Sequence, residues 1–248
     1  MNVFPFVIGT EYTPHIARAI FDHLDKETLL KCRLVTSVWQ SHVDSQTGLW
    51  SEISPQRYQE AVKEGRLDIC RLIIENTVSP NPPDLGGWTP LHTSASLGNT
   101  KICQLILENA ENKNPKGYRD GWTPLHCAAE GGHSATFKLI MDSVEDKNPA
   151  DKGGFSPLHL ASRKGHLTIC NIILENVADM NPPDIRRQTP LHEAAASGHL
   201  SIFQLLFNHA SDKEPQNEAG KTPLDLAKRY GRTHVIQWIK EMKFLENW

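Results

Sequence analysis

The chain has 248 residues, a formal net charge of -3 and a hydrophobic content of 39%, which is typical of a soluble protein with a sizeable core. Lys and Arg total 26 against 29 Asp and Glu, so there is no basic excess that would favour nucleic acid. The sequence lacks an apolar run long enough to cross a membrane, and residues 1–10 lack the features of a secretory signal. Five cysteines are too few for a disulfide-held scaffold. We therefore expect a cytoplasmic or nuclear protein with reduced cysteines that binds neither nucleic acid nor membrane.

The first predicted element is a short helical bundle over residues 1–55. Apolar residues recur at helical spacing from Ile16 to Leu24, and a second patterned run extends from Leu29 to Trp39. The segment resembles an F-box, whose pattern joins Ile-Phe-x-x-Leu to Asp-x-x-x-Leu-Leu, then to Cys-Arg-Leu-Val, a Trp four residues later and a closing Leu-Trp. Nearly all of these landmarks are present in order, ending at Leu49-Trp50.

The match departs from the F-box pattern at three places. Tyr12-Thr13 stands where Leu-Pro is usual, with Pro14 one residue later, and His15 and Thr36 replace a Glu and a Cys. The resemblance implies that this segment docks on the Skp-type adaptor of a cullin-RING ubiquitin ligase. The residues expected to contact the adaptor are Pro14, Ile16, Leu29, Leu30, Leu34, Val35, Trp39, Val43 and Trp50.

A second interpretation of residues 1–55 remains open. A bundle of this size is too small for an independent core. Its apolar residues therefore need a partner, which is either the adaptor or the exposed end of the repeats that follow. In the second case the helices only cap the repeat stack.

Residues 56–248 are predicted to be a repeat array. A Thr-Pro-Leu-His motif recurs at Thr89, Thr123, Ser156, Thr189 and Thr222, with Asp225 in place of the last His. A glycine recurs with nearly the same period at Gly65, Gly98, Gly132, Gly165, Gly198 and Gly231. Thr or Ser followed by Pro favours a helix start, and the glycine favours a helix end, so each unit is predicted to be two helices and a loop.

These motifs resemble the ankyrin repeat, a unit of about 33 residues with a turn and two helices. The resemblance implies an all-α fold: the helical F-box bundle, then an ankyrin-repeat α-solenoid with β-hairpin connectors. The predicted units are residues 56–88, 89–122, 123–155, 156–188, 189–221 and 222–248. The first unit lacks the motif and has Gln56-Arg57-Tyr58-Gln59 there instead.

The histidines and cysteines do not predict a metal, cofactor or catalytic site. His92, His126, His159 and His192 share one repeat position, and stacked helices lie about 8 to 10 Å apart. That spacing exceeds the roughly 4 Å between ligands of one zinc ion. The resemblance implies that these histidines hydrogen-bond backbone and the Thr hydroxyl. We expect a protein without enzymatic activity.

The resemblance places partner binding on the concave side, which is formed by loop tips and the first helix of each unit. Trp88, Trp122 and Phe155 precede consecutive Thr-Pro motifs and predict an aromatic anchor stripe, because large aromatics are enriched in interface hot spots. Alternatively, these rings only stack between adjacent hairpins. The full set of expected substrate contacts is Leu85, Trp88, Leu97, Trp122, Phe155, Arg163, Ile185, Arg186 and Tyr230.

Taken together, these features predict a substrate receptor of an SCF-type ubiquitin ligase, with an F-box for the adaptor and ankyrin repeats for an unidentified protein substrate. The alternative prediction is an ankyrin-repeat binding scaffold whose N-terminal helices only cap the stack.

Overall fold

The chain divides into two units, residues 1–52 and 53–248. The computed structural model describes residues 55–75, 77 and 79–246. The predicted F-box and its nine expected adaptor contacts, from Pro14 to Trp50, lie outside the described residues.

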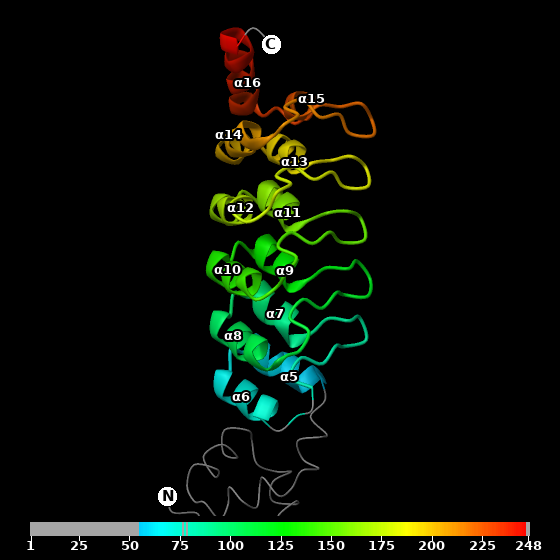
Figure 1. Ribbon diagram of the computed structural model, residues 1–248, viewed down its shortest axis with the longest axis vertical. Coiled ribbons are helices and arrows are strands. Elements are labelled where there is room, and N and C mark those ends of the chain that lie inside the picture. The colour runs from blue at the N-terminus through cyan, green and yellow to red at the C-terminus, as the bar shows by residue number, and fades with distance from the viewer. Residues whose placement is uncertain (1–54, 76, 78, 247–248) are drawn as a thin grey trace, which may run out of the picture. The chain divides into compact units, whose positions relative to one another are not determined.

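Within the described residues, the chain forms twelve helices that follow one another in six pairs (Figure 1). The first helices of the pairs are α5 (Pro55–Lys63), α7 (Pro90–Ser96), α9 (Pro124–Gly131), α11 (Pro157–Lys164), α13 (Pro190–Ser197) and α15 (Pro223–Arg229). The second helices are α6 (Leu67–Glu75), α8 (Thr100–Asn109), α10 (Ser134–Asp142), α12 (Leu167–Leu174), α14 (Leu200–His209) and α16 (Thr233–Glu246).

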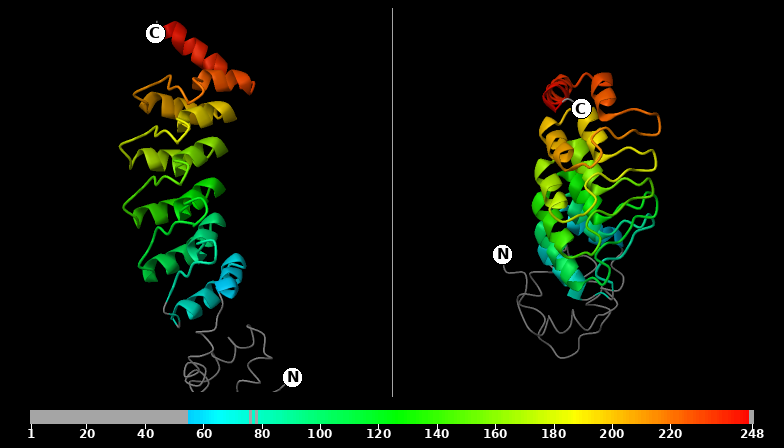
Figure 2. Two further views of the ribbon diagram at one scale, coloured as in Figure 1. Left: turned by 90° about the vertical axis from the view of Figure 1, so that its right-hand side faces the viewer. Right: turned by 45° about the horizontal axis from the view of Figure 1, so that its top comes forward.

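The first helices stack in one layer and the second helices in another, with the long loops projecting beside the first helices (Figures 1 and 2). Each first helix packs on the first helices before and after it, and on its own second helix. The core therefore runs as a line between the two layers. The predicted all-α solenoid is confirmed for these residues.

Each long loop ends in a tip turn. The tip turns are residues 84–88, 117–122, 151–155, 184–188 and 217–221. In the first of them the Asp84 amide donates to the Trp88 carbonyl, and one bond joins neighbouring tips, from the Tyr118 amide to the Gly86 carbonyl. The loops are thus hairpin-shaped, but no β-strand is present in the described part of the chain, which differs from the predicted β-hairpins. Prolines such as Pro82 and Pro83 precede the tips and lack the N–H that a longer ladder needs.

The helix boundaries follow the predicted signals. Five of the first helices begin at the Pro of the motif, with the preceding Thr or Ser in extended conformation as the N-cap. The recurring glycine after each first helix has a positive φ, from 65° at Gly231 to 87° at Gly165. The predicted left-handed helix ends are confirmed.

The core consists of apolar side chains from both layers. Leu91, Leu125, Leu158 and Leu191 of the motif are fully buried, and so are Ile and Phe residues of the second helices such as Ile169. At the C-terminal end, α16 places Trp238 edge-on against Phe203 and Phe207, with ring centroids 5.7 and 5.1 Å away. Trp238 therefore covers the apolar surface that α14 presents to the last pair.

The tip turns require a left-handed residue just before their last position. Gly87, Gly121, Gly154 and Gly220 occupy it in four turns, and Arg187 occupies it in the other with a φ of 57°. A Cβ on Gly154 would lie 2.9 Å from the Cα of Asp184 in the next tip, whereas a Cβ on Gly220 would meet nothing within 4 Å. Close contact between neighbouring tips thus adds a second requirement at Gly154.

Gly154→Ala should therefore destabilise the stack by about 2–3 kcal/mol, because left-handed strain of about 1 kcal/mol combines with a backbone clash. Gly220→Ala is the matched control and should cost only the strain, about 1 kcal/mol. Urea unfolding followed by circular dichroism measures both. Equal losses for the two variants would show that contact between the tips does not matter.

Candidate protein-interaction surface

The motif histidines are buried connectors between neighbouring helix pairs. Nδ1 of His92 accepts a hydrogen bond from the Thr89 amide at 3.1 Å and lies 2.9 Å from the Thr89 hydroxyl. Because Nδ1 accepts, the proton is assigned to Nε2, which donates to the Trp122 carbonyl in the next tip turn at 3.0 Å. The expected structural role is confirmed, and the same ring also joins one helix pair to the next loop.

The same bond recurs along the whole stack. His126 donates to the Phe155 carbonyl, His159 to the Gln188 carbonyl and His192 to the Lys221 carbonyl. In the first pair Gln59 stands at the His position, and its amide donates to the Trp88 carbonyl at 3.3 Å. In the last pair Asp225 keeps only the cap, accepting from Thr222, because no further tip follows within the described residues. Of the two functions of the histidine, Gln59 thus keeps the bond to the next tip turn, and Asp225 keeps the bond to the N-cap residue.

Burial keeps these imidazoles neutral. It lowers the pKa of His92 and of His159 to about 4, and it also lowers the pKa of His126 and His192.

A second set of bonds joins the turn that follows a first helix to the C-terminal end of the first helix in the preceding pair. His133 Nε2 lies 3.0 Å from the Ser96 carbonyl and its ring packs against Gly98 of the preceding pair. The equivalent contacts are Asn99 to Val62, His166 to Glu130, His199 to Arg163, and Arg232 to Ala196. Donors of three residue types make this bond, which is why sequence periodicity alone did not reveal it.

The cysteines of the array lie in its core. The described cysteines, Cys70, Cys103, Cys127 and Cys170, are free and buried, and burial raises the pKa of the first, second and fourth to about 12. Burial raises the pKa of Cys127 as well. Among residues 55–246 that the structure describes, no group of His, Cys, Asp and Glu is placed to hold a metal ion.

The three predicted anchor aromatics are half-buried. Trp88 stacks on His92 with ring centroids 4.7 Å apart, and Phe155 stacks on His159 at 4.6 Å. Trp122 lies over His126 at 5.9 Å, and its indole N–H donates to Asp151 of the next tip at 3.2 Å. Each ring thus rests on the histidine of its own helix pair, Trp122 also reaches the next tip, and part of each residue stays accessible.

We call the surface formed by the tip turns and the exposed ends of the first helices the tip face. Leu85 is fully exposed and Ile185 is 72% exposed, both on tip turns. Leu97 and Tyr230 are exposed at the ends of α7 and α15. Tyr118, on the tip next to Leu85, is also exposed and was not among the predicted residues. Its exposure could have been predicted by aligning the tip turns. Gly117 begins its turn as Asp84 begins the first one, so Tyr118 corresponds to Leu85.

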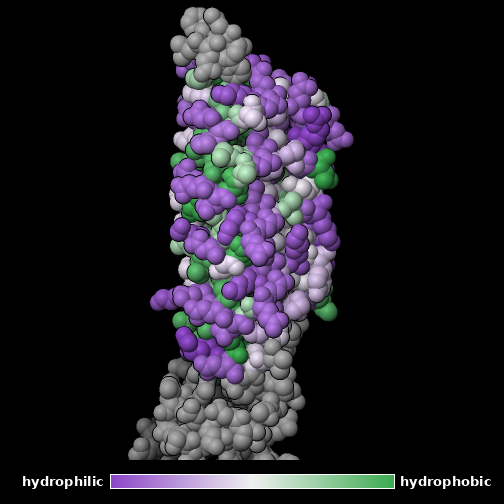
Figure 3. Space-filling model, viewed as in Figure 1, coloured by the Kyte–Doolittle hydropathy of each residue, from purple (hydrophilic) through white to green (hydrophobic). Residues whose placement is uncertain are grey.

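The predicted basic residues differ in their surroundings. The Arg163 guanidinium lies 5.0 Å over the Phe155 ring and 3.5 Å from Glu130, which also pairs with Lys164 at 2.8 Å. Arg186 is exposed on its tip turn. The face shown in Figure 3 is mostly hydrophilic, with hydrophobic spots over the stacked helices and at the margin where the loops project. The exposed apolar residues of the tip face come from different helix pairs, since the tip turns of Leu85 and Ile185 are separated by two others.

Comparison with protein families accounts for this architecture. A family model described as ankyrin repeats (3 copies) matches residues 58–117, 110–184 and 177–244, which together make up more than half of the chain. The chain belongs to the ankyrin-repeat family. No curated relative matches the sequence.

Ankyrin repeats are protein–protein interaction modules, so the array of this chain is a binding module of that kind. No F-box is detected by the same comparison, and the matched segments do not fix the number of repeats. Among the described helices, none has the length and apolar character to cross a membrane.

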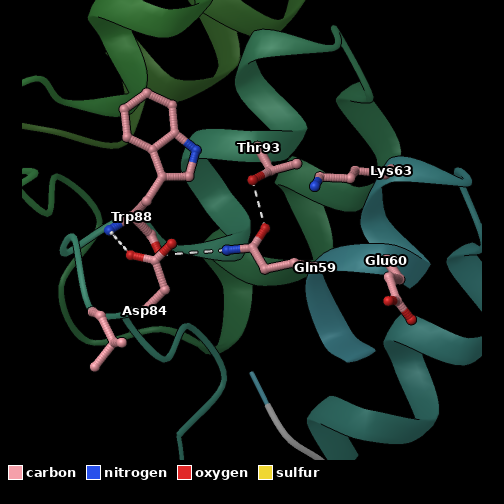
Figure 4. Close-up of a pocket in the computed structure, with 7 residues that line it drawn as sticks. Gln59, Glu60, Lys63, Asp84, Trp88 and Thr93 are labelled. Atoms are coloured by element: carbon pink, nitrogen blue, oxygen red, sulfur yellow. Dashed lines mark hydrogen bonds between the residues drawn. The ribbon is translucent and has the colours of Figure 1, made fainter. Parts of the chain in front are cut away.

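At the N-terminal end of this ankyrin array, the tip face has a hollow of about 400 Å³ between α5 and the first tip turn (Figure 4). It is lined by Gln59, Glu60, Lys63, Asp84, Leu85, Trp88 and Thr93. Gln59 forms its floor, because its amide donates to the Trp88 carbonyl and its oxygen accepts from Thr93. Two predicted contact residues, Leu85 and Trp88, are thus brought together with charged residues of α5 that the sequence did not indicate.

Proposed function

We propose that this protein is the substrate receptor of an SCF-type ubiquitin ligase. Residues 1–55 act as an F-box that binds the Skp-type adaptor, and residues 56–248 form six ankyrin repeats that hold the protein to be ubiquitinated. The chain itself is not an enzyme in this proposal, since ubiquitin transfer belongs to other subunits.

The observation that carries substrate binding is the set of exposed side chains on the tip face. Leu85, Leu97, Ile185 and Tyr230 are large apolar residues that remain 47% to 101% exposed, although the core of the stack is closely packed. Exposed apolar residues beside half-buried aromatic rings and charged groups resemble the anchors of protein interfaces. Trp88, Trp122, Phe155, Arg163 and Arg186 complete the proposed substrate contacts.

The F-box part of the proposal is supported by sequence pattern. The run from Leu29 to Trp39 keeps the spacing of the F-box landmarks, and the residues proposed to contact the adaptor fall within Pro14 to Trp50.

The experiment is co-purification with the intact chain and two double variants. Leu34→Asp with Trp39→Ala should reduce binding of the purified Skp-type adaptor at least about tenfold, because a buried charge and a lost aromatic remove two anchors. It should leave the proteins held by the array unchanged. Leu85→Asp with Ile185→Asp should do the opposite.

Leu167→Asp is the matched control, since Leu167 is an exposed leucine on α12 in the layer away from the tips (Figure 1). It should leave both interactions unchanged. Retention of the adaptor by the first double variant would contradict the F-box. If removing residues 1–50 destabilises the array, and no adaptor co-purifies with the intact chain, the N-terminal helices only cap the stack.

A further inference from the structure

Trp88 lacks the hydrogen bond to the next tip turn that two of its equivalents make. The residue before each Thr-Pro motif lies beside the first residue of the next tip turn, and two such pairs are hydrogen-bonded. Trp122 donates to Asp151 at 3.2 Å, and the oxygen of Gln188 accepts from Asn217 at 2.9 Å. By position, the first residue of the tip turn that follows Trp88 is Gly117, which has no side chain to accept such a bond.

Within residues 79–246, consequently, no acceptor is paired with the indole N–H of Trp88. One face of the indole stacks on His92, while the residue as a whole lines the hollow (Figure 4). Trp88 thus offers the hollow both an aromatic ring and a hydrogen-bond donor.

An equivalent ring elsewhere in the array already binds a cationic side chain. Over Phe155, which is equivalent to Trp88, the guanidinium of Arg163 lies 5.0 Å from the ring centroid and close to the Glu130 carboxylate. The residue of α7 that corresponds to Arg163 is Ser96, whose side chain is too short to reach Trp88. The place filled by a guanidinium over Phe155 is therefore left open over Trp88, and tryptophan is the better cation–π partner.

The charged groups of the hollow also favour a cation. Glu60 and Asp84 contribute two carboxylates against the single ammonium of Lys63, and all three side chains are exposed. One oxygen of Asp84, Oδ1, accepts from the Gly86 and Trp88 amides at 2.8 Å, so Oδ2 is left for a guest. Leu85 supplies an apolar wall for the methylene stem of a long side chain.

We infer that the hollow between α5 and the first tip turn binds an arginine side chain of the partner protein. The guanidinium stacks on Trp88 and pairs with Asp84, Glu60 adds negative charge at the rim, and a backbone carbonyl of the partner accepts from the Trp88 indole. This inference rests on the proposed role of the tip face in holding a partner. Lys63 limits the affinity, because its ammonium shares the rim with the guest.

The test is titration of the full ¹⁵N-labelled chain with N-acetyl-arginine amide, observed at the indole signal of Trp88 by NMR. Trp88→Phe identifies that signal among the six tryptophans. We expect the Trp88 signal to shift progressively with the arginine probe. N-acetyl-citrulline amide, which has the same length without the charge, should bind about tenfold more weakly, and N-acetyl-glutamate amide should bind less than either.

Variants of the charged residues at the rim test whether arginine is bound through its charge. Asp84→Asn together with Glu60→Gln should weaken arginine binding about tenfold, since the pair with Asp84 and the negative charge of Glu60 at the rim are both lost. Asn preserves the turn, because Asn217 makes the same bonds to the Ala219 and Lys221 amides in the last tip. Lys63→Glu should strengthen binding, and Asp151→Asn at the Trp122 tip should change nothing.

Three results would overturn the inference. They are an unmoved Trp88 signal at the solubility limit of the arginine probe, equal binding of citrulline, and a preference for glutamate that Lys63→Glu abolishes. The proposed function fails separately, if Leu85→Asp with Ile185→Asp releases no partner. If that variant releases partners while Asp84→Asn with Glu60→Gln retains them all, only the arginine inference is wrong.

Discussion

His159→Ala should lower the free energy of unfolding by about 4 kcal/mol. The ring is fully buried, accepts from the Ser156 amide at 3.1 Å and donates to the Gln188 carbonyl at 3.1 Å. Alanine leaves both backbone groups without a partner, at about 1–3 kcal/mol each, and removes the surface on which Phe155 stacks. Urea unfolding at pH 7 measures the loss.

The chain supplies the matched control for this variant. His159→Gln keeps a donor for the Gln188 carbonyl, as Gln59 does for the Trp88 carbonyl, and should recover about half of the loss. A loss below about 1 kcal/mol for His159→Ala would contradict the role of the ring as a connector between neighbouring pairs, since a single net hydrogen bond is worth about that much.

Acid should unfold the array well above the pH at which most carboxylates titrate. The pKa of His92 and of His159 is about 4 in the folded chain, against about 6.5 in the unfolded chain. The unfolded chain therefore binds more protons as the pH falls below 6.5, and stability is lost progressively until about pH 4. Each of these two histidines should lower the free energy of unfolding by about 2 kcal/mol at pH 5 relative to pH 7.

His126 and His192 should add to this loss, because burial lowers their pKa in the same direction. Urea midpoints at pH 7 and pH 5 measure the effect. His159→Gln should flatten the pH dependence by about 2 kcal/mol, since glutamine does not titrate. Equal midpoints at the two pH values would show that the buried imidazoles do not control acid stability.

The local elements of the array were predictable because each is set by residues close together in sequence. Thr89-Pro90 begins α7, and Gly98 ends it in a left-handed conformation, as expected from the cap and the missing Cβ. The connectors were predicted less well. Prolines such as Pro82 and Pro83 remove donors, so the tips are joined by single hydrogen bonds rather than by strands.

The candidate surface was predictable only in part. Loop position was enough to indicate that Leu85 and Ile185 are exposed. The position of Leu85 beside α5 could not be predicted, because Glu60 and Lys63 come from a pair that lacks the Thr-Pro-Leu-His motif. Tyr118 was missed because its tip turn is one residue longer than the others.

The sequence by itself determined the period and the helix ends, because the same cap and glycine signals recur in each unit, and the resemblance to ankyrin repeats implied the structural role of the histidines. Only the tertiary structure decided what lies between repeats. It showed that Gln59, His92 and their equivalents donate to the next tip, and that the Trp122 indole donates to Asp151 of the tip after its own. These contacts join residues about thirty positions apart, so they depend on how neighbouring units stack, and no pattern within one unit specifies that geometry.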